Sequence, residues 1–160
     1  MAKTQRRSVL PGLLLGLGFG GFVDGIVLHE ILQWHHMISG AESPETLAGL
    51  KLNVVADGFF HVATWWLVMA GSIATLVSWR KGRLAPTWSF HFGLLLVGWG
   101  VFNVVEGVVN QQILGVHHVR DDLGAPVAWD IGFLVSGVLM IVLGYGLYRR
   151  GSRRRAETLH

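Results

Sequence analysis

The sequence contains no cysteine, and charged residues make up only 14% of its 160 positions. Without cysteine the chain has no disulfide, no thiolate metal ligand and no thiol nucleophile. More than half of the residues, 51%, are hydrophobic, and the mean hydropathy is +0.48, which is typical of a membrane protein. The composition therefore excludes a water-soluble enzyme, and it leaves His, Asp and Glu as the side chains for any catalysis or metal binding.

The apolar residues fall into four long blocks, at about 9–34, 52–79, 88–116 and 126–148. Each block is near or above the ~20 residues that cross a bilayer as a helix. Backbone groups in hydrocarbon must be satisfied within their own segment, so the continuous apolar runs predict helices rather than a barrel. We expect an all-α fold, a compact polytopic membrane four-helix bundle that forms one domain over residues 1–160.

Basic residues predict the orientation of this bundle. Eleven of the thirteen Lys and Arg residues lie before the first block, between the second and third, or after the fourth. Only Lys51 and Arg120 lie in the opposite loops. The positive-inside rule then places both termini in the cytoplasm of a bacterial inner membrane, with the bilayer rather than nucleic acid as the partner of the basic tail.

The first and third blocks are related by a shift of 82 residues. This shift matches seven residues of the first block with identical ones in the third, including a double histidine, and it pairs Asp24 with Glu106. Asp57 and Asp130 match more weakly between the second and fourth blocks. We therefore predict two tandem αα-hairpin repeats, at about 10–79 and 92–148, which run parallel and are related by a pseudo-two-fold axis along the membrane normal.

Five acidic residues lie in or near the apolar blocks, whereas no Lys or Arg lies in any of them. A carboxylate in the bilayer is costly, so we expect all five to face the interior and to find neutral or cationic partners there. Histidines lie at similar depth, and helical spacing predicts one stripe containing His29, Gln33 and His36. His91 is remote from the others, and we interpret it as structural.

Imidazole and carboxylate ligands without sulfur suit a transition metal, with copper or zinc first and iron as a third candidate. The candidate metal ligands are His29, Asp57, His61, Glu106, His35, His36, His117 and His118. The candidate proton-carrying or ligand-orienting residues are Asp24, Glu30, Asp130 and Asn110.

Several motifs resemble an uncharacterised bacterial family of four-helix integral membrane proteins, known only as a domain of unknown function. The motifs are Asp24-Gly-Ile-Val-Leu-His29-Glu-Ile-Leu-Gln-Trp-His-His36, Asp57-Gly-Phe-Phe-His61, Phe102-Asn-Val-Val-Glu106-Gly and Leu114-Gly-Val-His-His-Val-Arg120. The resemblance covers about 16–146 and implies the fold, but it supplies no activity.

The leading functional prediction is metal handling, which includes transport, delivery or assembly of an extracytoplasmic metalloprotein. One alternative is a membrane oxidoreductase with a non-haem metal, or with a haem b held by His29 and His61. Another is a proton-linked transporter working as a homodimer. The last is a structural protein whose helices are held by polar contacts. Whether the protein is an enzyme stays open at this point.

Overall fold

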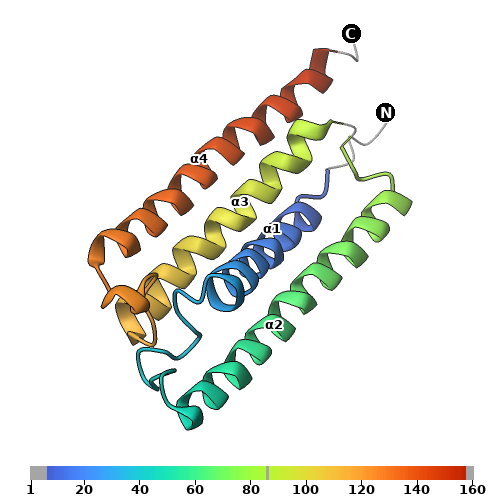
Figure 1. Ribbon diagram of the computed structural model, residues 1–160. Helices are drawn as coiled ribbons and strands as arrows, with labels where there is room; N and C mark the ends of the chain where they lie inside the picture. Colours follow the sequence, from blue (N-terminus) through green and yellow to red (C-terminus); the bar gives the residue numbers. More distant parts are fainter. Residues whose placement is uncertain (1–6, 86, 158–160) are drawn as a thin grey trace.

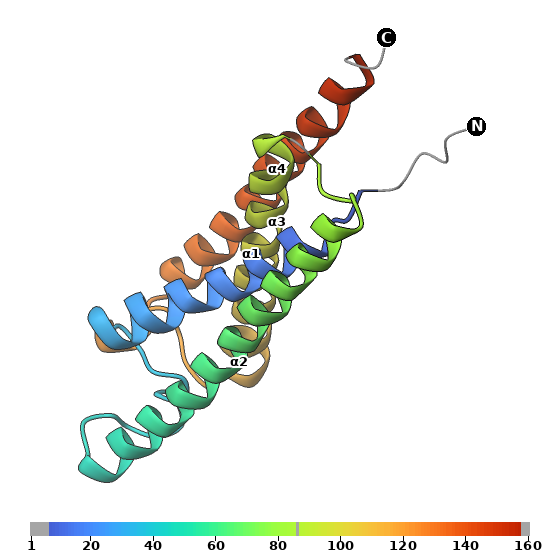
Figure 2. The same cartoon turned by 90° about the vertical axis from the view of Figure 1, so that its right-hand side faces the viewer.

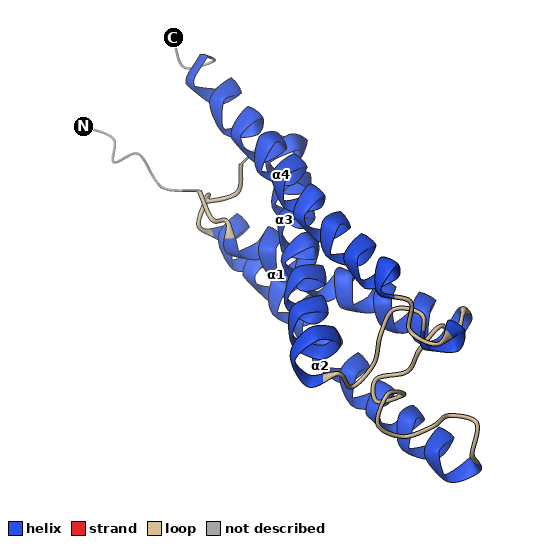
Figure 3. Cartoon of the chain, turned by 90° about the vertical axis from the view of Figure 1, so that its left-hand side faces the viewer, coloured by secondary structure: helices blue, strands red, loops and turns tan. Residues whose placement is uncertain are grey.

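The computed structural model describes residues 7–85 and 87–157, and these residues form four long helices with no strand (Figures 1 and 3). In chain order the elements are α1 (Leu10–Phe22), η1 (Val23–Ile31), α2 (Leu47–Arg80), α3 (Trp88–Glu106), η2 (Gly107–Leu114), η3 (Asp121–Leu123) and α4 (Val127–Glu157). The helix of α1 continues directly into η1, and α3 into η2. Each of the four resulting helices is long and apolar enough to cross a membrane, as the sequence predicts.

The four helices lie in a row, in the order α2, α1, α3, α4 (Figure 1). Among the described residues, the long helices pack only as the neighbouring pairs of this row. The expected compact bundle is therefore wrong in its packing, because α2 and α4 flank the row and do not meet. The side view in Figure 2 shows that the first turns of α2 extend beyond the end of η1. The two central helices, α1 and α3, consequently carry most of the buried surface.

Glycine brings α1 and α3 into close contact. A Cβ atom at Gly16 would lie 2.2 Å from the carbonyl oxygen of Leu95, and one at Gly98 would lie 2.4 Å from that of Leu13. The two backbones therefore touch without side chains between them. Lipid provides no hydrophobic drive for helices to associate, so such close packing between small residues supplies much of the attraction. This contact sets the spacing of the two helices that carry the central polar residues.

The outward faces of α2 and α4 consist of exposed apolar side chains, including Phe59, Trp66, Ile73, Leu139 and Leu143. In water such a surface would aggregate, whereas in a bilayer it contacts hydrocarbon at no cost. The interior holds the reverse composition, since most of the largest fully buried side chains are His, Asn and Asp. Polar groups thus concentrate along the middle of the row.

The central helices both finish as π-helices, η1 and η2, whose wider turns shift the following residues relative to an α-helix. Gln33 has φ +50° after η1, and Gly115 has φ +58° after η2. The predicted stripe of His29, Gln33 and His36 is therefore wrong, because the helix ends at Ile31 and Gln33 is exposed. These reversals direct the two double histidines back toward the interior instead of out of the membrane.

The loops that follow the two π-helices are joined to each other. The amide of Gly40 donates to the carbonyl of Val116 (2.8 Å), and the amide of Asp122 donates to the carbonyl of Trp34 (3.1 Å). The guanidinium of Arg120 lies 4.4 Å from the ring centre of Trp34, within cation–π range. The two loops therefore form one cap over the ends of the central helices.

Candidate metal centre

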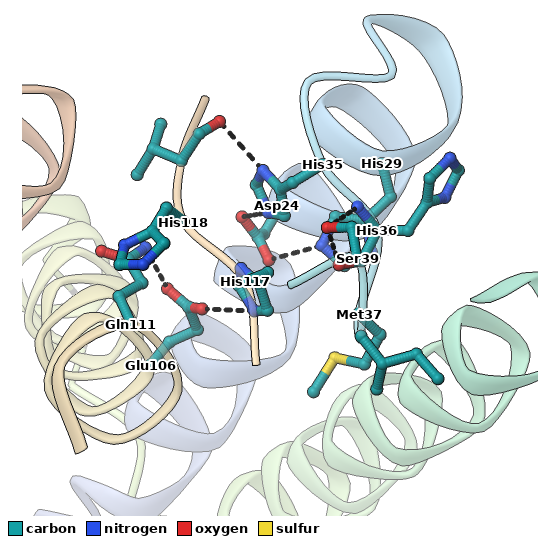
Figure 4. A network of polar contacts seen from close by, with 12 residues as sticks. Asp24, His29, His35, His36, Met37, Ser39, Glu106, Gln111, His117 and His118 are labelled. Atoms are coloured by element: carbon teal, nitrogen blue, oxygen red, sulfur yellow. Dashed lines mark hydrogen bonds and ion pairs between the residues drawn. The ribbon is translucent and has the colours of Figure 1, made fainter. Parts of the chain in front are cut away.

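A cluster of buried His and acidic side chains lies where η1, η2 and the two loops meet (Figure 4). Its central members are Asp24, His29, His35, Glu106 and His117, each at most 5% exposed. Among the residues that the structure describes, no Lys or Arg is buried. The negative charges of this cluster therefore have only imidazoles, amides or a bound cation to balance them.

Asp24, His29 and His35, which we name the Asp24 trio, offer ligand atoms that lie within 4.8 Å of one another. Nε2 of His29 is 3.3 Å from Oδ2 of Asp24, and Nε2 of His35 is 3.9 Å from Oδ1 of the same carboxylate. Two ligands held about 2.1 Å from a tetrahedral ion are separated by about 3.4 Å. The separation of 3.3 Å is close to the edge of such a coordination shell, and the separation of 3.9 Å is longer.

Asp57 of α2 orients the ring of His29. Its Oδ1 lies 2.8 Å from Nδ1 of His29, and it also accepts a hydrogen bond from the amide of Met37 (2.8 Å). A carboxylate that accepts a hydrogen bond from Nδ1–H leaves Nε2 as the nitrogen with the free lone pair, and this is the arrangement common behind metal-bound histidines. Nε2 of His29 is buried and makes no hydrogen bond of good geometry. It is therefore positioned as a ligand.

The rings of His35 and His117 stack across the middle of the cluster, with centroids 4.5 Å apart and planes 5° from parallel. Nδ1 of His35 donates to the carbonyl of Val119 (3.0 Å), so its Nε2 also keeps a free lone pair. Burial lowers the pKa of His35 to about 4, and it lowers the pKa of His117 to about 4 as well. Both rings are thus neutral near pH 7, which is the form that binds metals.

Glu106, Gln111 and His117, which we name the Glu106 trio, face the Asp24 trio from the other central helix. Nε2 of His117 lies 3.1 Å from Oε1 of Glu106, and Nε2 of Gln111 donates to its Oε2 at 3.2 Å (Figure 4). Oε1 of Gln111 and Nδ1 of His117 are buried without a hydrogen-bond partner among the described residues. The second trio therefore also presents unused ligand atoms.

The remaining members of the double histidines, His36 and His118, bind carboxylates outside the central cluster. Nδ1 of His36 lies 2.7 Å from Oδ2 of Asp57, and Nδ1 of His118 lies 2.6 Å from Oδ2 of Asp130. Both oxygens of Asp57 and of Asp130 are used in these contacts and in bonds from loop amides. Asp57 and Asp130 therefore contact histidine rings through their Nδ1 atoms and lie outside the central cluster.

Other predicted residues lie away from the cluster. His61 packs against Gly25, and its Nε2 is buried without a hydrogen bond to any residue that the structure describes. Glu30 is exposed, so the expectation that all five acidic residues face the interior is wrong for this one, which the π-helix turns outward. Asn110 is half-buried, and its carbonyl accepts the amide of Val116 (3.0 Å). His91 lies 2.7 Å from the carbonyl of Ala85, in a purely local contact.

Gln111 was not among the candidate ligands inferred from the sequence, and Asp24 was given only an orienting or proton-carrying role. In the structure Asp24 is the carboxylate shared by His29 and His35, and Gln111 stands beside Glu106 as His29 stands beside Asp24. The 82-residue shift carried the signal, because it aligns Gln111 with His29.

Comparison with other proteins supplies a family and no activity. No curated protein and no solved structure matches the chain significantly. A family model does match, over residues 11–151, which is nearly the full length and includes every member of the cluster. The resemblance inferred from the motifs is therefore confirmed, and the chain belongs to the family described as "Predicted membrane protein (DUF2243)".

Proposed function

We propose that the protein is a membrane metal-binding protein whose ion is held by the Asp24 trio, with Glu106 and His117 beside it. One observation carries the proposal. The ligand atoms of Asp24, His29 and His35 converge in a buried site, and no Lys or Arg among the described residues is buried there to neutralise the carboxylate. Burying such a group unpaired is expensive, so a cation is the economical partner.

The chemistry of the ligands indicates which ions fit. The trio supplies two imidazoles and one carboxylate, and the chain has no cysteine to add sulfur. Nitrogen and oxygen ligands of this kind suit Zn²⁺ and Cu²⁺, with Fe²⁺ as a third candidate. The role we propose is metal handling: transport, or delivery to an extracytoplasmic metalloprotein.

An open pocket next to the cluster supplies an access route for the ion. It has a volume of about 670 Å³, and its lining includes His35, His36, Glu45, Asp121 and Asp122. An acidic mouth attracts cations, and the two histidines offer the first ligands on the way inward. With basic residues concentrated at the opposite end of the helices, we propose that this pocket opens to the extracytoplasmic side of a bacterial inner membrane.

We also propose that the chain arose by duplication of an αα-hairpin. The row α2, α1, α3, α4 has the order that a two-fold axis between α1 and α3 would produce. Two features recur 82 residues apart. The first is the positive φ at Gln33 and Gly115. The second is a backbone hydrogen bond that closes each π-helix, from the amide of Trp34 to the carbonyl of Leu28 and from the amide of Val116 to the carbonyl of Asn110. A site on such an axis draws ligands from both halves, as the stacked His35 and His117 do.

Metal analysis of the purified protein tests this function. We expect about one equivalent of a transition metal in the wild-type protein after loading and desalting, and less than a tenth of that in a His29→Ala/His35→Ala variant. His91→Ala is the matched control, since His91 lies in the first turn of α3, at the opposite end of that helix from Glu106, and should leave the metal content unchanged. Metal-free wild-type protein after loading would refute the proposal.

A second candidate function is oxidoreduction at a non-haem iron. Two histidines and one carboxylate with open positions form the ligand set of many iron oxygenases, and the Asp24 trio has this composition. The geometry favours a bare ion over a haem, because the rings of His35 and His117 lie 4.6 Å and 5.9 Å from that of His29. Oxygen consumption by the iron-loaded protein, absent from the zinc-loaded protein, would move this function to first place.

A third candidate is proton-linked transport. His36, Asp57, His29 and Asp24 form a continuous chain of contacts, each no longer than 3.3 Å, from the pocket to the middle of the cluster. Such chains carry protons in pumps and transporters. Uptake driven by a pH gradient in metal-free proteoliposomes would favour this function over metal handling.

A further inference from the structure

The Glu106 trio repeats the arrangement of the Asp24 trio with one ligand exchanged. Glu106 takes the place of Asp24, His117 takes the place of His35, and Gln111 takes the place of His29. In both trios the carboxylate lies between the other two side chains, at contact distances of 3.1 to 3.9 Å. The exchange replaces an imidazole by a carboxamide, whose oxygen is a weaker ligand for late transition metals than an imidazole nitrogen.

The carboxylate next to each trio also makes fewer bonds to imidazoles in the second half than in the first. In the first half, Asp57 bonds the rings of both His29 and His36. In the second half, Asp130 bonds His118 and the amide of Val119, and Gln111 rather than an imidazole stands at the position that corresponds to His29. The acceptor that would orient such an imidazole is nevertheless present in the fold.

The ligand atoms of the Glu106 trio are also left without ordinary partners. Oε1 of Gln111, Oε1 of Glu106 and both ring nitrogens of His117 are buried and make no hydrogen bond of good geometry within the part of the chain that the structure describes. The exposed fractions of the three residues are 3%, 5% and 0%. Leaving several buried polar atoms unsatisfied is costly unless a ligand binds them.

We propose that the Glu106 trio is a second cation site, weaker than the first, which binds a divalent transition-metal ion through Glu106, His117 and the carbonyl oxygen of Gln111. The inference rests on the proposed metal-binding function and extends it: the protein holds two ions of unequal affinity, one in each half. The two trios differ in ligand type at a single pair of residues, His29 and Gln111.

A residue swap tests this inference. The probe is Zn²⁺ alone, titrated against purified protein in detergent with a chelator in competition. For the wild-type protein we expect one tight and one weak ion, at least about tenfold apart in Kd. Gln111→His should tighten the second ion at least about tenfold, and His29→Gln should weaken the first by about as much or more. The double variant should again bind one tight and one weak ion, now with the halves exchanged.

One further variant and a folding check keep the test independent of misfolding. Glu106→Gln removes the charge of the second trio and should abolish the weak ion while the tight one stays, and size-exclusion chromatography with circular dichroism confirms that each variant is folded. A single ion in wild-type protein and in Gln111→His would overturn the second site but leave the proposed function intact. No ion in any of the proteins would overturn the proposed function itself.

Discussion

Asp57 provides the sharpest test of how the cluster is held together. Its carboxylate accepts from the ring of His29 (2.8 Å), the ring of His36 (2.7 Å) and the amide of Met37 (2.8 Å), and it is fully buried. In an Asp57→Asn variant the amide keeps one oxygen, and its nitrogen cannot accept a hydrogen bond. At least one of the three donors therefore loses its acceptor, and the negative charge that strengthens His29 as a ligand disappears.

The expected loss follows from similar carboxylate–histidine–metal arrangements, in which removing the outer partner costs about 10- to 100-fold in metal affinity. This corresponds to about 1.4 to 2.8 kcal/mol of binding free energy. We expect the variant to lose this much in a Zn²⁺ titration monitored by chelator competition. The free energy of unfolding should fall as well, by about 1 to 3 kcal/mol, because a buried donor is left unpaired.

Asp130→Asn is the matched control. Asp130 is 1% exposed and also accepts from one imidazole and one loop amide, so its substitution should cost similar stability. It bonds no ring of the Asp24 trio, and the affinity for the tight ion should change by less than about threefold. Equal losses of affinity in the two variants, or no loss in Asp57→Asn, would refute the view that Asp57 orients a metal-binding His29.

Three more predictions follow from the fold. Gly98→Ala should destabilise the protein by about 1 to 3 kcal/mol and weaken metal binding, because the new Cβ atom would meet the backbone of Leu13 and push α1 away from α3. Thermal unfolding in detergent measures the loss of stability. Gly146→Ala is the control, because a Cβ atom there meets nothing within 4 Å. Arg120→Ala should loosen the cap by removing the contacts with Trp34 and Trp129, which faster amide exchange in 116–124 would reveal; unchanged exchange would contradict it. Because the chain lacks cysteine, a single Ser43→Cys should react with a membrane-impermeant maleimide on intact cells and Lys81→Cys should not; the reverse pattern would invert the proposed topology.

The sequence predicts the helices well and their packing poorly, for a physical reason. Long apolar runs must become helices in a bilayer whatever their neighbours, so the four spans follow from composition. The neighbour relations depend on close backbone contacts such as Gly16 with Gly98, and the apolar pattern says nothing about which glycines meet. The row of helices therefore differs from the expected compact bundle.

The candidate site was predicted in its residues more than in its arrangement. The sequence singled out His29, His35, His117 and Glu106 because histidines and carboxylates are rare in or beside membrane spans. All four lie in the buried cluster. The sequence predicted Asp57 as a ligand and Asp24 as an orienting residue, whereas the structure places Asp24 among the candidate ligands and Asp57 behind His29. This could not be foreseen, since α-helical spacing was assumed through His36 while the chain forms η1 and reverses at Gln33. A π-helix depends on local packing that hydrophobic periodicity does not report.

The proposed metal centre is tested most directly by X-ray absorption spectroscopy of the metal-loaded protein in detergent. We expect a shell of nitrogen and oxygen atoms at about 2.0 to 2.2 Å, with the outer-shell scattering of at least two imidazoles. That imidazole signal should be lost in His29→Ala/His35→Ala and retained in His91→Ala. A spectrum of a hydrated ion without imidazole, identical in all three proteins, would contradict the central claim.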